Sequence, residues 1–247
     1  MLWHKAWLES RVRFLLSAGV LAFLCLGSIY RARTGFPPPE RPDLPYSAWV
    51  WGNIYGNLNP TVFVILAMIL GLGGLQRERP VGTAVFTLSL PVTRIRLIGI
   101  RAAVGTIQVI LLSLIPSMLV PTFSPLLAGQ LYPVSQSLQF GILFLSWGIV
   151  AFAAGFLLSS LFAGEFTGTA LCVIVPVIYR IIIQSSQTIA GYPAANYASF
   201  MSGLPYISSP VKVTITAPLP WTNFLALFVV SMILFAGSIA RTNRQDF

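Results

Sequence analysis

The chain has 247 residues, of which 56% are hydrophobic and only 9% are charged. Soluble domains carry roughly 25% charged residues, so this composition excludes an ordinary water-soluble domain and predicts the bilayer as solvent. The net charge of +9 could indicate nucleic-acid binding, but the sequence shows no basic, water-exposed face for it. Basic loops at an anionic membrane surface explain the charge better. The apolar runs recur along most of residues 1–247, so we expect one all-α, multi-spanning domain.

Six of these runs are long enough to cross a membrane as helices, since about 20 residues span the hydrocarbon core and about 17 can suffice. They predict spans over residues 14–30, 48–75, 97–122, 138–161, 167–183 and 220–240. Before the first span, Trp3, Lys5 and Trp7 suit an amphipathic helix at the membrane surface. Pro60 interrupts the second span, and we expect a kink there.

Two connections of this chain have distinct characters. The link between the fourth and fifth spans is very short and contains Glu165, which is either a solvated residue or a contact with a partner. Residues 184–218 are long for a structureless loop, and a plain loop or an outer helical hairpin are both open. Arg180, close to the end of the fifth span, is expected to extend its charge to the outer interface.

Six spans place both termini on the same side, and the positive-inside rule selects that side. The cationic residues on the side of the termini outnumber those on the other side, and they are Lys5, Arg11, Arg13, Arg77, Arg79, Arg94, Arg96, Arg101, Arg241 and Arg244. The bias predicts cytoplasmic termini.

The polar residues exclude several activities. The chain has one histidine, His4, and six acidic residues, none of them in the middle of a predicted span. No histidine or acid is therefore placed to serve a metalloprotease or a proton-coupled carrier within the membrane. Composition leaves a serine hydrolase open, but no histidine lies within a span to act as its base. Phosphate loops need Gly-Lys followed by Ser or Thr, but Lys5 and Lys212, the only lysines, follow His4 and Val211. We therefore expect no catalytic, cofactor or metal site on this chain, and any ATPase must be another chain.

Residues 76–96 between the second and third spans have the pattern of a short, stiff helix. Pro80 suits a first helical turn, and Pro91 disfavours helix at the residue before it. Thr93 suits the N-cap of the next span, and Arg94 and Arg101 share one face of it. The element either turns the chain around at the interface or docks a cytoplasmic partner.

The same stretch resembles the ABC-2 family of ABC transporter permeases. The resemblance rests on Glu78-Arg79, Gly82-Thr83, the turn from Leu88 to Arg94, and basic Arg101. Residues 155–171 are similar to the family's tight connection between spans four and five, and the two ends of the chain resemble the family's amphipathic start and short charged tail. Val81 departs from the family, which often has an acid before Gly-Thr.

The resemblance implies a permease subunit, an exporter, in the cytoplasmic membrane. Residues 76–96 would contain a coupling helix that docks on a separate ATPase subunit, which would bind ATP and magnesium. The coupling residues it implies are Glu78, Arg79, Gly82, Thr83, Leu88, Pro91, Thr93, Arg94, Arg101 and Glu165. A second copy, or a related permease, would complete the transporter. A non-transporting scaffold or assembly subunit is the main alternative, followed by a secondary carrier or an intramembrane enzyme.

Small residues recur along the fourth span. Gly141, Gly148 and Gly155 are spaced by seven residues, and Ala151 lies four before the last of them. Small residues permit close contact between helices in a membrane. We expect this stripe to pack inside the subunit, with a dimer interface or a cargo-facing surface as the alternative.

Overall fold

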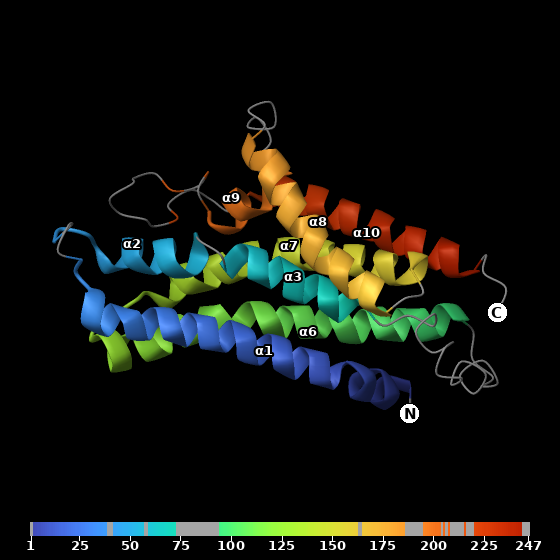
Figure 1. Cartoon of the computed structure of the whole chain (residues 1–247), viewed down its shortest axis with the longest axis horizontal. Coiled ribbons are helices and arrows are strands. Elements are labelled where there is room, and N and C mark those ends of the chain that lie inside the picture. Colours follow the sequence, from blue (N-terminus) through green and yellow to red (C-terminus); the bar gives the residue numbers. More distant parts are fainter. Residues whose placement is uncertain are drawn as a thin grey trace.

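The computed structural model describes residues 2–38, 42–56, 59–72, 94–162, 165–185, 195–203, 205, 207, 215 and 220–243. The helices that form its main bundle are α1 (Leu2–Gly35), α3 (Asn59–Gly71), α6 (Arg94–Phe123), α7 (Val134–Leu161) and α10 (Trp221–Asn243). These run side by side along the longest axis of the molecule (Figure 1). Within the described residues there is no strand, only an isolated bridge between Ile207 and Ile215. The all-α prediction is confirmed.

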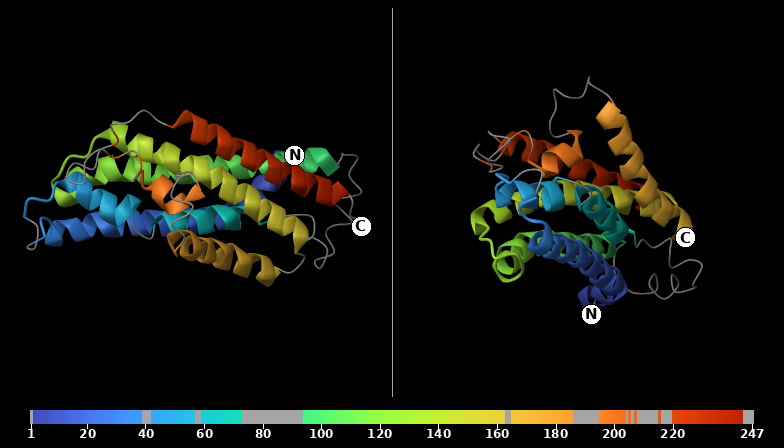
Figure 2. Two further views of the ribbon diagram at one scale, coloured as in Figure 1. Left: turned by 90° about the horizontal axis from the view of Figure 1, so that it is seen from above. Right: turned by 60° about the vertical axis from the view of Figure 1, so that its left-hand side comes forward.

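Five segments are long and apolar enough to cross a membrane, namely Leu2–Gly35, Tyr46–Gly71, Arg96–Ala128, Val134–Leu161 and Trp221–Thr242, the second of which includes residues 57–58 outside the described part. By length and composition, they are compatible with the predicted multi-pass membrane protein. The fifth predicted span corresponds to α8 (Glu165–Ser185), whose apolar part, Phe166–Ile182, is shorter than the other five. This helix crosses the bundle obliquely (Figures 1 and 2). A count of six spans therefore stays a prediction.

The first helix is longer than the sequence pattern suggests. The segment expected at the membrane surface is helical, but it continues without a break into the first span as part of α1. With 34 residues, α1 is about 50 Å long at about 1.5 Å per residue, well above a hydrocarbon thickness of about 30 Å. The helix can therefore cross the membrane and still project beyond it.

The second span has two helical segments in the described part. It starts as α2 (Tyr46–Val50) and continues as a π-helical turn, Trp51–Tyr55, closed by a hydrogen bond from Gly56 N–H to Trp51 O of 2.6 Å. The next helix, α3, begins at Asn59, so Pro60 lies in its first turn, where a missing N–H leaves no bond unmade. The expected kink at Pro60 stays a prediction, because residues 57–58, which connect the two helical segments, lie outside the described residues.

Helix α7 lies at the centre of the bundle and packs against α3, α6 and α10 (Figure 2). Aromatic rings from α7 and the second span fill the core. The Tyr55 ring stacks on Phe140 with centroids 4.2 Å apart, and Phe63 meets Phe144 edge-on at 5.1 Å. The buried Tyr55 hydroxyl is hydrogen-bonded to the Ser137 hydroxyl at 2.9 Å, so the core leaves this polar group satisfied.

The small residues of α7 lie at its contacts with neighbouring helices. At Gly155 a Cβ atom would meet the Met68 backbone of α3, and the Met68 Cα atom would lie only 2.9 Å from it. At Gly148 a Cβ atom would lie 2.8 Å from Phe63 Cε1, and at Gly141 it would meet the Ser117 side chain of α6. Ala151 is also buried. The structure places this stripe inside the subunit.

Candidate functional site

The helix ends that flank the predicted coupling residues lie at one end of the bundle. The first residues of α1 and the last residues of α10 lie at this end, where α6 and α8 also begin (Figure 1). The connection between α3 and α6 therefore leaves and re-enters the bundle on this side. We call this the terminal end of the bundle.

Most of the predicted coupling residues are in that connection. Residues 73–93 lie outside the described residues, and they include Glu78, Arg79, Gly82, Thr83, Leu88, Pro91 and Thr93. Arg94 and Glu165 are the first residues of α6 and α8, and their side chains also lie outside the described part. Arg101 is the one predicted coupling residue whose side-chain contacts the structure describes.

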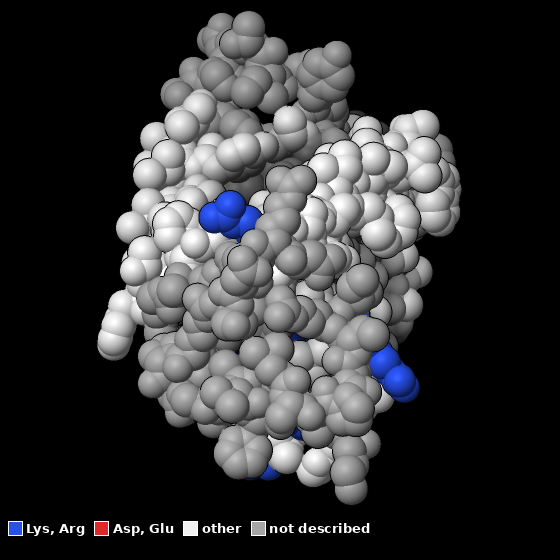
Figure 3. All heavy atoms as spheres, turned by 90° about the vertical axis from the view of Figure 1, so that its right-hand side faces the viewer, with Lys and Arg blue, Asp and Glu red and all other residues white. Residues whose placement is uncertain are grey.

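The terminal end is basic in the part that the structure describes. Lysine and arginine side chains are visible on this face, and no acidic side chain of a described residue is visible there (Figure 3). The described cationic side chains that belong to this end of the helices are Lys5, Arg11, Arg13, Arg96, Arg101 and Arg241. A surface of this sign suits an anionic membrane leaflet or an acidic protein partner.

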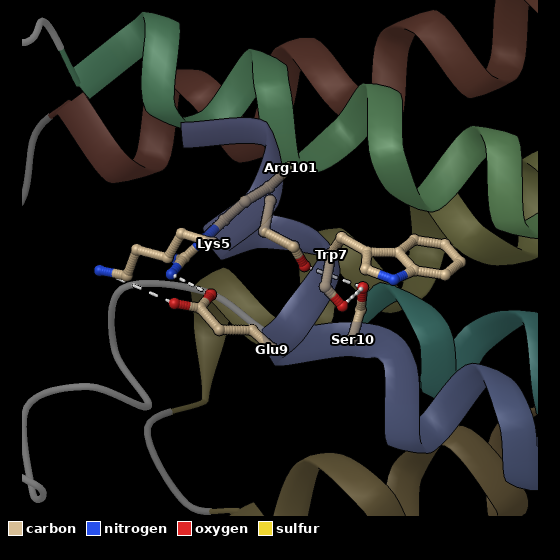
Figure 4. Close-up of polar contacts among 6 residues, drawn as sticks. Lys5, Trp7, Glu9, Ser10 and Arg101 are labelled. Atoms are coloured by element: carbon tan, nitrogen blue, oxygen red, sulfur yellow. Dashed lines mark hydrogen bonds and ion pairs between the residues drawn. The ribbon is translucent and has the colours of Figure 1, made fainter. Parts of the chain in front are cut away.

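An ion pair joins the starts of α1 and α6. The Arg101 guanidinium donates from Nη2 to Glu9 Oε2 at 2.8 Å, and Lys5 Nζ lies 3.7 Å from Glu9 Oε1 (Figure 4). The Arg101 side chain is only 10% exposed, whereas that of Glu9 is 39% exposed. Arg101 is therefore mostly withdrawn from water, and the carboxylate compensates its charge.

A second polar contact lies deeper between the same helices. Gln108 is fully buried, and its Nε2 donates to Ser10 Oγ at 2.7 Å. Ser10 Oγ in turn donates to the Ala6 carbonyl oxygen at 2.9 Å, within α1 (Figure 4). Because Gln108 is seven residues beyond Arg101, both side chains leave the same face of α6 toward α1.

Arg101 was predicted from the sequence as a site residue, whereas Glu9, Ser10 and Gln108 were not. The available sign was Gln108, the only amide side chain in the predicted span 97–122. A lone amide in a membrane helix needs a partner on a neighbouring helix. Nothing in the sequence places that partner on α1, because contacts between helices depend on how the bundle packs.

These contacts form a two-point link between α1 and α6. The ion pair and the amide–hydroxyl bond hold the first turns of α6 to α1 along one face. A force applied to the start of α6 would therefore move α1 with it. Among the described residues there is no group of three or more His, Cys, Asp or Glu side chains that could hold a metal ion.

The strength of the link can be measured by double-mutant cycles. In the cycle of Glu9→Gln and Arg101→Gln, we expect a coupling of roughly 0.5–1 kcal/mol in the free energy of unfolding, near the top of the range for partly exposed pairs. Lys5→Gln is the matched control, because it removes a cation from the same carboxylate at the longer distance of 3.7 Å. A Lys5–Glu9 coupling equal to or larger than the Arg101–Glu9 coupling would contradict this account of the link.

Comparison with known proteins adds no identification: no family model matches the chain, and no curated protein matches it. The resemblance to ABC-2 permeases therefore rests on the motif residues themselves.

Proposed function

We propose that this chain is the permease subunit of an ATP-driven ABC transporter of the ABC-2 type, acting as an exporter in the cytoplasmic membrane. The observation that carries the proposal is the motif from Glu78 to Arg94, followed by basic Arg101, between two membrane spans. The helical bundle supports it, because the ends of α3 and α6 that flank this motif lie at the same end as both chain termini. In this proposal, that end faces the cytoplasm.

The proposed mechanism divides the work between chains. ATPase subunits bind ATP and magnesium and close when this nucleotide is bound. Their movement is transmitted to the permease through a coupling helix within residues 76–96. A stiff helix transmits a displacement that a loose loop would absorb. The link from Arg101 to Glu9 and from Gln108 to Ser10 would then carry the movement from α6 to α1. A second copy, or a related permease, completes the path for the cargo.

Nucleotide binding gives a direct test of this division. The purified chain alone should neither bind nor hydrolyse ATP, because it has no Gly-Lys-Ser/Thr sequence. Together with its ATPase partner in lipid nanodiscs, the preparation should hydrolyse ATP. The measurement is equilibrium binding of a fluorescent ATP analogue to the isolated chain, beside the hydrolysis rate of the complex. Micromolar affinity of the isolated chain for the analogue would count against the proposal.

A further inference from the structure

Arg180 lies near the middle of the bundle rather than at the outer interface, where the sequence analysis expected it. Its Nη1 donates to Thr61 Oγ1 of α3 at 2.7 Å. Thr61 lies ten residues before the end of α3, which is about 15 Å along the helix. The oblique path of α8 explains the difference, because it brings a residue close to the C-terminal end of α8 to the first turn of α3, near the middle of the segment Tyr46–Gly71 (Figure 1).

Aromatic rings beside Arg180 confirm this depth. Trp147 stands 13 residues after the first residue of α7 and 14 before its last, so it marks the middle of that helix. Its ring meets Tyr197 edge-on at 5.8 Å, and Tyr197 stacks with Tyr179 at 6.0 Å. Tyr197 belongs to the short helix α9 (Tyr197–Met201), which follows α8 in the chain.

Hydrogen bonds hold these rings in place. The Tyr197 hydroxyl donates to the Pro176 carbonyl oxygen at 3.0 Å and lies 3.3 Å from Thr61 Oγ1. The Tyr179 hydroxyl donates to the Ala195 carbonyl oxygen at 2.6 Å. The aromatic rings beside the guanidinium are therefore held in position by contacts within the protein, without a ligand.

The charge of Arg180 is not compensated by the residues that the structure describes. A guanidinium carries five N–H donors, and Thr61 Oγ1 accepts one of them. No carboxylate with a described side chain pairs with Arg180. An ionised residue at the middle of a membrane is costly to keep and marks a site for a ligand or an ion far more often than a packing position.

The approach to Arg180 is apolar. Along α8 the side chains of Val173 and Val177 are exposed, and they precede Arg180 by seven and three residues, which puts them on the same side of the helix as Arg180. A ligand that reaches the guanidinium along this helix must therefore tolerate a hydrocarbon surface while it delivers a negative charge. A free anion in water fits only the second requirement.

We propose that Arg180, with Thr61 and the rings of Trp147, Tyr179 and Tyr197, binds the anionic headgroup of an amphipathic molecule. The guanidinium presents paired donors that match a phosphate or a carboxylate, and the apolar face of α8 accepts the hydrocarbon part. The site itself stands on the contacts above. That such amphiphiles are the class of cargo rests in addition on the permease function proposed above.

The test is the affinity of the purified full chain for dodecyl phosphate in an uncharged detergent, measured by calorimetry. We expect Arg180→Gln to weaken binding by roughly tenfold to a hundredfold, as is typical when a hydrogen bond to a charged group is lost. Arg33→Gln is the matched control, because it removes an exposed cation from the end of α1 and should leave binding unchanged. Inorganic phosphate, the headgroup without its chain, should bind much more weakly than dodecyl phosphate.

Two results would overturn the inference, namely unchanged affinity in Arg180→Gln or equal binding of inorganic phosphate. If Arg180→Gln does not fold, photo-crosslinking of a diazirine-bearing dodecyl phosphate to the parental chain decides the matter. Labelled peptides should then contain Arg180 or Tyr197, and labelling confined to other peptides would contradict the site. A chain that captures an ATPase but does not bind dodecyl phosphate would refute this site and leave the proposed function standing; the reverse outcome would refute the function alone.

Discussion

Gly155→Leu should cause the largest loss of folded protein of any single change to the small residues of α7. The hydrogen on Gly155 Cα faces the backbone of α3, and a Cβ atom there would meet the Met68 carbonyl oxygen and lie 2.8 Å from its carbon. Backbone cannot move aside as a side-chain tip can, so the two helices must separate. We expect a cost at or above the upper end of the roughly 1–3 kcal/mol typical of overpacked cores.

The measurement is the melting temperature in detergent, beside the yield of monodisperse protein. Gly19→Leu is the matched control, because the same change in α1 meets no atom within 4 Å and should leave the melting temperature unchanged. Gly148→Leu should be intermediate, since its obstacles are the side-chain atoms Phe63 Cε1 and Val109 Cγ1 at 2.8 and 2.9 Å. Equal melting temperatures for Gly155→Leu and Gly19→Leu would show that α3 and α7 do not approach each other at Gly155.

Gly82→Pro should abolish coupling to the ATPase while the chain still inserts in the membrane. The proline would remove a backbone donor inside the coupling helix expected within residues 76–96 and would clash with the preceding turn, at a local cost of roughly 3 kcal/mol or more. The membrane spans should be little affected, because each is inserted by its own apolar residues. The measurement is the ATPase rate of the reconstituted complex, beside the amount of inserted chain.

Gly82→Ala serves as the control, because alanine keeps the N–H group and favours a helix. It should support the parental ATPase rate. Arg94→Glu, which reverses a charge at the start of α6, should also impair docking and leave insertion intact. A parental ATPase rate in the Gly82→Pro complex would contradict the proposed coupling helix.

The sequence predicted the helices well where a single physical pattern determines them. The starts and ends of α7 and α10 lie within a few residues of the predicted spans, since a long apolar run has no other stable state in a bilayer. The seven-residue spacing of Gly141, Gly148 and Gly155 predicted one packing face. It did not predict Met68, Phe63 and Ser117 as the residues opposite, because the partners depend on how α3 and α6 sit against α7.

Other features could not be predicted because they depend on orientation. A proline is visible in a sequence, but whether it bends a helix or starts one depends on the preceding residues, and here the π-helical turn ends before Pro60. Arg180 was expected at the outer interface on the assumption that the fifth span is upright. Its contact with Thr61 follows from the tilt of α8, for which the residue pattern contains no information.

The central claim is that this chain works with a separate ATPase, and affinity purification from native membranes in a mild detergent tests it most directly. A tagged parental chain should retain, in a near-stoichiometric amount, a protein whose sequence, read by mass spectrometry, contains the Gly-x4-Gly-Lys-Ser/Thr loop. The same purification with Gly82→Pro should lose that protein, and with Gly19→Leu should keep it. Recovery of the parental chain in intact, folded form with no such ATPase would contradict the account and favour a scaffold or assembly subunit.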